Sequence, residues 1–378
     1  MPAAETIDAT IPVRLEVIEH VSDDVRSGMR LFAKLKGQDP QSDFVRSQWA
    51  SLHTLNPCGS GLFVIGWHGT DLVGFYGLIP VPMTVGGETV KGAKGEYHVV
   101  DPAYRKLKDP VSGMPLPTAL VLRAFQEAFA RGYRVVQANP GRGAQFSVHH
   151  AGGKAINFSQ IQYIAFPRLA KLMWTGPWKR RPGPSLTAMI GHFVTAAMRL
   201  RSLPSRRRAG NLFQVKWDIP LLTLGDPGGN RLVAENIDYL AFRFPSELYL
   251  TLTIVRRNTG EPCAQLVLER PMPNGIARVC HWTPQNLPEK VWPLAMDALY
   301  RACQVHRASM ITMVITDLST GSLPMSAYGF IARPTVQTIF LAAADHTWCQ
   351  EQVSAPWLLT DAHTGFIATH DTKTPGIV

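Results

Sequence analysis

One stretch of this chain, from Gly95 to Leu120, constrains its fold more than any other. It reads Gly-Glu-Tyr-His-Val-Val-Asp-Pro-Ala-Tyr-Arg, followed by a polar loop, Gly113 and an apolar segment with helical spacing. Its first part has the composition of a strand, and its last part repeats apolar residues every three or four positions. A strand that ends in Val-x-Pro-x-x-Arg and continues through glycine into a helix can hold a pyrophosphate on backbone N–H groups.

The same order of elements is predicted twice. In the first half we expect strands and helices in the order strand, strand, strand, helix, strand, helix, strand, over 61–67, 72–81, 90–100, 118–130, 133–138, 145–150 and 158–165. In the second half the same order is predicted over 248–256, 264–269, 277–282, 289–306, 310–316, 323–328 and 335–343. Residues 1–60 look helical, with helices over 24–35 and 43–52. This coarse repeat indicates a duplicated fold unit.

A basic segment separates the two halves. Between Pro167 and Gly210 there are ten Lys and Arg residues and no Asp or Glu. The formal charge of this segment therefore equals the net charge of +10 of the whole chain. Apolar residues from Ser185 to Arg199 follow amphipathic helical spacing. We therefore expect an N-terminal domain over 1–166, a basic amphipathic insert over 167–212 and a C-terminal domain over 213–378.

Cysteine usage and the N-terminus bear on the compartment. The five cysteines are scattered without C-x-x-C spacing, which fits a reducing compartment and argues against a disulfide scaffold or a metal site. The first residues lack a basic-then-apolar signal pattern, and no apolar run reaches the ~18–20 residues that would span a bilayer. We expect a cytoplasmic protein, peripheral at the inner face of the cytoplasmic membrane.

The basic insert has three interpretations. It is a solvated linker, a nucleic-acid-binding segment or a membrane-surface element. We favour an anionic membrane surface as the partner of 167–210, because Trp and Phe lie beside Lys and Arg and acidic residues are absent. A base-reading motif is lacking, so we expect no nucleic acid. An acidic acyl carrier protein would also suit a basic face.

Several short motifs resemble those of the GNAT acyltransferase superfamily, and in particular bacterial chains that carry two GNAT-like halves. In the first half they are Leu72-Val73-Gly74, the run Val100 to Arg105, and Asn139-Pro140. In the second half they are the run Tyr239 to Phe244 and Tyr328-Gly329-Phe330. The resemblance implies an α/β (α+β) fold of two GNAT-like domains, each with a mixed, mostly antiparallel sheet flanked by helices.

The resemblance also implies a donor site in the first half. The donor would be acyl-CoA or an acyl carrier protein thioester, used as co-substrate without a permanently bound cofactor. Its binding residues would be Val99, Val100, Arg105, Lys106, Lys108, Gly113, Thr118 and Asn139. The loop departs from the family pattern because it is longer and lacks one glycine, which Lys106 and Lys108 would offset as point charges. The second half lacks a glycine or basic residue after 277–282, so we expect it to shape the acceptor pocket.

Acyl transfer to an amine needs a base and a donor for the developing oxyanion. In the family a backbone amide of the fourth strand polarises the thioester carbonyl. In this chain that amide would be the N–H of Val99 or of Val100. Glu96 and His98 are two residues apart, so we expect them on the same side of the strand and either could be the base. The family tyrosine that acts as general acid after Asn139 is missing, and His149 is the catalytic candidate there.

These observations favour an N-acyltransferase that moves an acyl group from CoA to a primary amine. The insert favours a lipidic acceptor such as a sphingoid base, as in bacterial ceramide synthesis. Three alternatives remain: an amino-sugar N-acyltransferase of polysaccharide or lipopolysaccharide assembly, a non-catalytic acyl-CoA- or membrane-binding module, and a Fem-type aminoacyl transferase.

Overall fold

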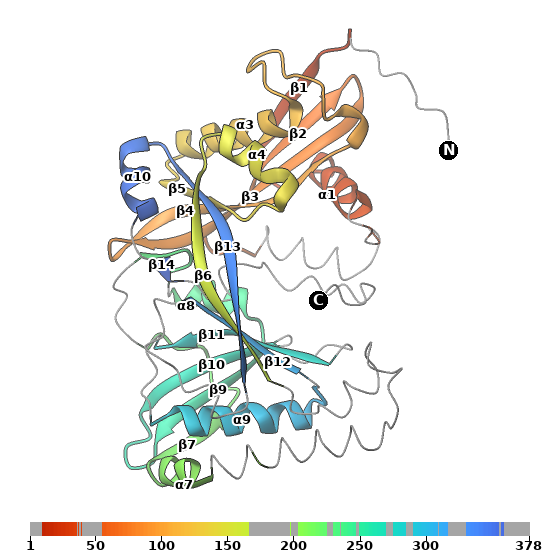
Figure 1. Cartoon of the computed structure of the whole chain (residues 1–378). Coiled ribbons are helices and arrows are strands. Elements are labelled where there is room, and N and C mark those ends of the chain that lie inside the picture. Colours follow the sequence, from red (N-terminus) through yellow and green to blue (C-terminus); the bar gives the residue numbers. More distant parts are fainter. Residues whose placement is uncertain are drawn as a thin grey trace. The chain divides into compact units, whose positions relative to one another are not determined.

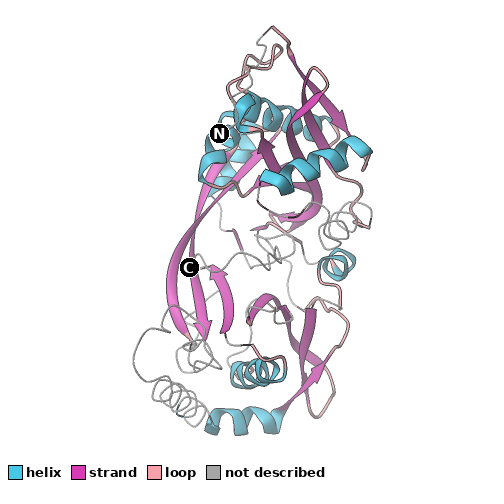
Figure 2. Cartoon of the chain, turned by 90° about the vertical axis from the view of Figure 1, so that its right-hand side faces the viewer, coloured by secondary structure: helices cyan, strands magenta, loops and turns pink. Residues whose placement is uncertain are grey.

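The fold is known from a computed structural model (Figure 1). It describes residues 10–35, 37, 39, 55–165, 197, 203–224, 230–234, 236–246, 249–269, 275–284, 290–308, 310–316, 330–354 and 357–358. The chain forms two compact units. Unit 1 comprises 1–158, 229–234 and 338–356, and unit 2 comprises 159–228, 235–337 and 357–378. Each unit combines a sheet with helices (Figure 2).

Unit 1 is built on a mostly antiparallel sheet. Its strand order is β1 (Val13–Ile18), β2 (Leu62–His68), β3 (Asp71–Val85), β4 (Glu88–Val100), β5 (Val135–Ala138) and the end of β13 (Ile331–Ala343). Only β4 and β5 in this series are parallel. The short strand β8 (Asn230–Arg231) pairs with β3, and the start of β6 (Lys154–Ala165) also belongs to this unit.

Helices cover both faces of this sheet. They are α1 (Asp23–Leu35), α3 (Leu116–Ala130) and α4 (Arg142–His150), with α10 (His346–Ser354) and the 3-10 turn η1 (Pro102–Tyr104) elsewhere in the unit. A Cβ atom on Gly74 would lie 2.8 Å from Leu120 of α3, whereas the next residue, Phe75, packs its ring on Gly28 of α1. Because neighbouring strand residues point to opposite faces, α1 and α3 lie on opposite faces of the sheet.

Unit 2 has a second, mostly antiparallel sheet. Its strand order is the end of β6, then β12 (Met310–Thr316), β11 (Ile276–Thr283), β10 (Pro262–Glu269), β9 (Tyr249–Arg256) and β7 (Phe213–Trp217). The helices are α7 (Leu203–Leu212), α8 (Ile237–Arg243) and α9 (Trp292–Val305), and β14 (Trp357–Leu358) is a further short strand. Trp282 and Trp292 are each 1% exposed, so both belong to the core of this unit.

The two halves of the chain exchange a strand. Residues 160–165 of β6, from the first half, pair antiparallel with β12. Residues 340–343 of β13, from the second half, pair antiparallel with β5. Thus the strand that lies beside β5 in unit 1 is made some two hundred residues later in the chain.

Most predicted elements in the described residues are confirmed, with one correction. The expectation that residues 1–60 are helical is wrong for Val13–Ile18, which forms β1 because Leu15 and Val17 pack on the unit 1 core at strand spacing. The motif Tyr239 to Phe244 lies largely on helix α8. The predicted helices over 43–52 and 323–328, and nearly all of that from Ser185 to Arg199, lie outside the described residues.

The boundaries at 166/167 and 212/213 stay a prediction. In the described part of the chain, no helix is long and apolar enough to cross a membrane.

Candidate functional site

Strands β4 and β5 diverge in the middle of the unit 1 sheet. They pair in parallel only from Gly92 opposite Val135 to Gly95 opposite Ala138. Beyond Gly95, β4 continues to Val100 beside β3 alone. The divergence leaves backbone groups of β4 facing a gap, which is where a ligand with its own hydrogen-bonding groups could insert.

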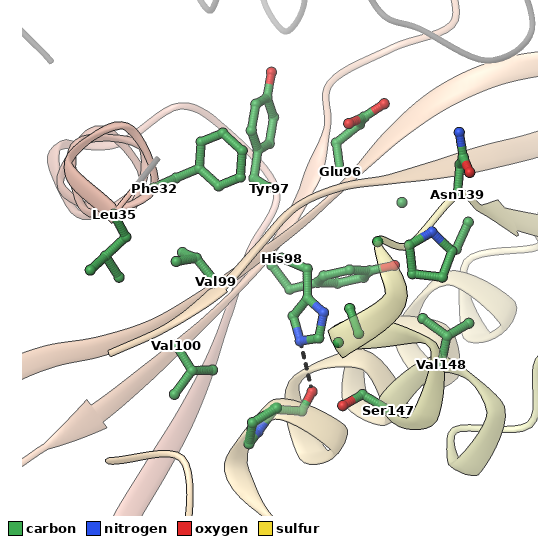
Figure 3. Close-up of a pocket in the computed structure, with 18 of the residues that line it drawn as sticks. Phe32, Leu35, Glu96, Tyr97, His98, Val99, Val100, Asn139, Ser147 and Val148 are labelled. Carbon is green, nitrogen blue, oxygen red and sulfur yellow. Dashed lines mark hydrogen bonds between the residues drawn. The ribbon is translucent and has the colours of Figure 1, made fainter. Parts of the chain in front are cut away.

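A cavity of about 500 Å³ occupies this gap (Figure 3). Phe32 and Leu35 of α1 line it on one face of the sheet, and Pro117 of α3 and Ser147 of α4 line it on the other. Since α1 and α3 lie on opposite faces, the cavity passes through the sheet. Of the predicted site residues, those that line it are Glu96, His98, Val99, Val100, Arg105 and Asn139.

A β-bulge at Tyr97 changes which way the β4 side chains point. The β3–β4 register shifts between Phe75 and Gly77, and Tyr97 has a φ of 59°. One extra residue on a strand reverses the alternation beyond it. The prediction that Glu96 and His98 share a side is therefore wrong: they leave the strand in opposite directions (Figure 3).

Glu96 and Tyr97 lie on the α1 face. Glu96 forms an ion pair with Lys94, whose side chain is 4% exposed while that of Glu96 is 27% exposed. The ring of Tyr97 meets Phe32 edge-on, with centroids 5.4 Å apart. Burial, and then the charge of Glu96, raise the pKa of Tyr97 well above its ordinary value. The α1 face of the cavity is thus apolar with one carboxylate.

His98 lies on the α3 face. Its Nε2 is 3.0 Å from the carbonyl oxygen of Pro117, which can only accept, so Nε2 carries a proton and donates it. The ring also meets Tyr76 edge-on, with centroids 5.3 Å apart. His98 therefore ties β4 to the start of α3, and Tyr76 is a cavity residue that the sequence analysis missed.

The backbone direction of β4 selects one of the two predicted amides. Asp101 donates its N–H to the carbonyl of Val73 on β3, at 2.9 Å. Backbone groups alternate along a strand, so the N–H of Val99 also points to β3 and that of Val100 points into the gap. The carbonyl of Val100 also points away from β3, because it accepts a hydrogen bond from Arg105 Nε at 3.3 Å.

The loop before α3 is closed by its own hydrogen bonds. Asp109, 5% exposed, accepts from both the N–H and the hydroxyl of Ser112, each at 2.7 Å. Gly113, in the left-handed region with φ 67°, donates its N–H to the carbonyl of Asp109 at 2.8 Å. Gly113 is therefore needed for the turn.

The first turn of α3 is likewise satisfied within the chain. Leu116 donates to Leu107, Thr118 and Ala119 donate to Pro115, and Pro117 has no N–H. The prediction that this helix presents free N–H groups is wrong. The first N–H groups are occupied because α3 starts with Pro115-Leu116-Pro117 and the preceding loop folds against this start.

Five predicted site residues do not line the cavity. Thr118 is 1% exposed in the core, and Gly113 serves the turn. Lys106 and Lys108 are exposed on the same loop as Arg105. His149 is exposed on α4, where its ring meets His150 edge-on at 5.6 Å. The positions of His149, Gly113 and Thr118 provide no geometric support for their predicted roles.

The start of α4 lines the cavity instead. Residues Gly141 to Ala144 border it, and Gly141 provides no side-chain cap for the helix. An α-helix has no intrahelical partner for its first N–H groups, and the positive end of its dipole favours an anion. The run Gly141-Arg142-Gly143 directly follows Asn139-Pro140, so its glycines and its arginine were the sequence signal for this helix start.

Comparison with known proteins reveals likeness in structure only. No protein-family model and no curated protein matches the sequence. A GCN5-related N-acetyltransferase from Anabaena variabilis is similar with a TM-score of 0.53 at 11% identity, covering 88% of this chain and 73% of that one. A GCN5-related N-acetyltransferase from Kribbella flavida gives a TM-score of 0.51 at 14% identity, covering 89% and 72%.

A conserved protein of unknown function from Enterococcus faecalis gives a TM-score of 0.54 at 10% identity, covering 90% of this chain and 75% of that one. At such low sequence identities the structural likeness shows the fold alone. The chemistry has to be argued from the residues of the site. The chain has the fold of the GCN5-related N-acetyltransferases, with two such domains.

Proposed function

We propose that the protein is an acyl-CoA-dependent N-acyltransferase that acts on a primary amine. The observation that carries the proposal is the cavity that passes through the unit 1 sheet where β4 leaves β5. A thioester held in this gap would be open to an acceptor from one face of the sheet, while its carrier occupies the other. Separate entrances let two substrates meet without exchanging places.

The charges assign the two faces. Arg105 and Arg142 border the cavity. Helices α3 and α4 line the cavity on the face of the sheet opposite α1. We place the phosphates of the donor near these arginines and the start of α4, with Lys106 and Lys108 as further point charges on the loop. Asn139, Val99 and Val100 would border the pantetheine arm.

The chemistry then follows from the β4 groups. The amine nitrogen attacks the thioester carbon, and the carbonyl oxygen gains negative charge beside the N–H of Val100. Glu96, on the α1 face, takes a proton from the nitrogen. We assign the base to Glu96 over His98, because Nε2 of His98 is engaged by Pro117 on the opposite face.

The acceptor is a finer part of the proposal. Phe32, Leu35 and Tyr97 make the α1 face apolar, which suits an amine carried on an apolar body. A sphingoid base at an anionic membrane is our first acceptor class and an amino sugar our second. Of the basic insert, the described residues include α7, which presents Arg207 and Arg208 to solvent and could meet a membrane or an acyl carrier protein.

The test is thiol release. The protein is incubated with short- and long-chain acyl-CoA and with sphinganine or glucosamine, and free thiol and the N-acyl product are measured. We expect product with at least one pair, and a fall of about a hundredfold or more in Glu96→Gln. The matched control is Glu88→Gln, which changes an exposed carboxylate on the same strand. Tight acyl-CoA binding without any product would favour the binding-module alternative.

A further inference from the structure

The hydroxyl of Tyr76 is a buried polar group without a partner. Tyr76 lies on β3, is 2% exposed and borders the cavity. Its Oη makes no hydrogen bond to any residue that the structure describes. A buried donor without an acceptor destabilises a fold, so an unpaired one at a cavity wall calls for a functional explanation.

The position of this hydroxyl is fixed by Gly95. A Cβ atom on Gly95 would collide with Tyr76 Oη, and it would lie 3.4 Å from the Cβ of Ala138. Gly95 and Ala138 are the last pair that joins β4 to β5. Tyr76 Oη therefore lies where the two strands part, at the floor of the gap.

The ionisation of Tyr76 suits a proton donor. Burial, and then the charge of Glu96, raise its pKa above the ordinary value, so the phenol keeps its proton at neutral pH. The same burial raises the pKa of a thiol that is released inside the cavity, which makes the nascent thiolate a stronger base there than in water. Burial therefore raises the pKa of both groups, the Tyr76 phenol that gives the proton and the thiol that receives it.

We propose that Tyr76 is the catalytic acid that protonates the departing sulfur. The inference rests on the proposed function. As the tetrahedral intermediate collapses, the C–S bond breaks and its electron pair stays on sulfur. The Oη–H bond then breaks as the S–H bond forms. The phenolate regains a proton that Glu96 took from the amine, carried by water, so the amine proton ends on the thiol.

One other hydroxyl must be weighed. Ser147 of α4 is 6% exposed and borders the same face of the cavity as His98. It lies on the helix after Asn139, but a serine hydroxyl is a far weaker acid than a phenol. Tyr76 Oη, in contrast to the Ser147 hydroxyl, is buried without a hydrogen-bond partner among the described residues. Ser147→Ala is therefore the second arm of the test.

The experiment compares Tyr76→Phe with the wild type in steady-state kinetics, with acyl-CoA varied at a saturating concentration of the amine. We expect kcat to fall about a hundredfold while KM for acyl-CoA stays within about twofold. The loss should shrink when the donor is an aryl thioester, whose thiolate leaves without a proton. Tyr133→Phe is the matched control, since Tyr133 is 8% exposed and does not line the cavity. Equal kcat for wild type and Tyr76→Phe would overturn the inference and leave the proposed function standing.

A binding measurement separates the two proposals without turnover. Isothermal titration calorimetry at alkaline pH compares the binding affinity of CoA with that of desulfo-CoA, which lacks the sulfur. We expect the wild type to prefer CoA by about fivefold and Tyr76→Phe to lose that preference, because a hydroxyl-to-thiolate hydrogen bond is removed. Binding of CoA without any such preference overturns the role of Tyr76. Failure of the wild type to bind CoA at all removes the proposed function and this inference with it.

Discussion

Tyr76 and Gly95 fit together so closely that any side chain on Gly95 would occupy the place of the Tyr76 hydroxyl. Gly95 precedes the bulge at Tyr97 on β4, and Tyr76 lies on β3 where the β3–β4 register shifts. The hydroxyl can therefore reach the gap between the strands only because residue 95 has no Cβ atom.

This relationship predicts the effect of Gly95→Ala. We expect a loss of about 1–3 kcal/mol in the free energy of unfolding, because the added methyl group overpacks a buried site. Gly95→Ala/Tyr76→Phe should recover part of it, since the colliding oxygen is gone while Tyr76 Cζ stays 3.1 Å from the methyl position. Urea denaturation measures both. Gly143→Ala, with open space at its Cβ, is the control and should not be destabilised.

A second prediction concerns acid stability. Hydrogen bonding to Arg131 is the main cause that lowers the pKa of Glu127, and Arg123 also lowers it. A carboxyl with a lowered folded pKa stabilises the fold above its unfolded pKa of about 4.3 and loses that effect as pH falls through the folded pKa. Glu127→Gln should cost about 0.5 kcal/mol at neutral pH, the size of an i,i+4 pair. In urea denaturation this difference should shrink as pH falls below about 4.3 and through the lowered folded pKa. A difference that persists in acid would contradict the ionic origin.

A third prediction concerns donor binding. Arg105→Ala and Arg142→Ala should each weaken CoA binding about tenfold or more, because each removes a charge-assisted contact to phosphate. The loss should be smaller in high salt, where such contacts are screened. Titration calorimetry at two salt concentrations measures this. Lys216→Ala, an exposed basic residue on β7, is the control. Unchanged affinity in both arginine variants would place the phosphates elsewhere.

A fourth prediction tests the core of unit 2. Burial raises the pKa of Cys303 on α9 to about 12, whereas Cys58 is only half-buried. Thiolates react and thiols do not, so iodoacetamide at pH 8 should modify Cys58 and leave Cys303 intact in the native protein. Both should react in urea, as read by peptide mass spectrometry. Alkylation of native Cys303 as fast as Cys58 would contradict the packing around α9.

Local patterns in the sequence predict most of the fold. Strand β2 and helix α3 are visible as β-rich and helical runs, and the repeated order of elements indicates two similar units. The pairing partners are not visible in this way. Nothing local in residues 340–343 distinguishes pairing with β5 from pairing within their own half, because strand choice depends on contacts that are distant in sequence.

The site is predictable in part, for a related reason. Glu96, His98 and Arg105 were found because they accompany the Val-x-Pro-x-x-Arg motif, and all three border the cavity. Whether Glu96 and His98 share a side of β4 depends on the bulge at Tyr97, a residue type that rarely adopts a positive φ. Tyr76 reads as an ordinary core aromatic of β3, and only its unpaired hydroxyl distinguishes it.

The strand exchange has a consequence for how the chain is made. While the ribosome synthesises the middle of the protein, β5 has β4 on one side and an open edge on the other, since its second neighbour is residues 340–343. Exposed strand edges recruit other chains, so we expect the nascent first half to be prone to aggregation until residues 340–343 have been made. A gene cut at residue 166 would encode a fragment that lacks residues 340–343 and therefore lacks this partner of β5.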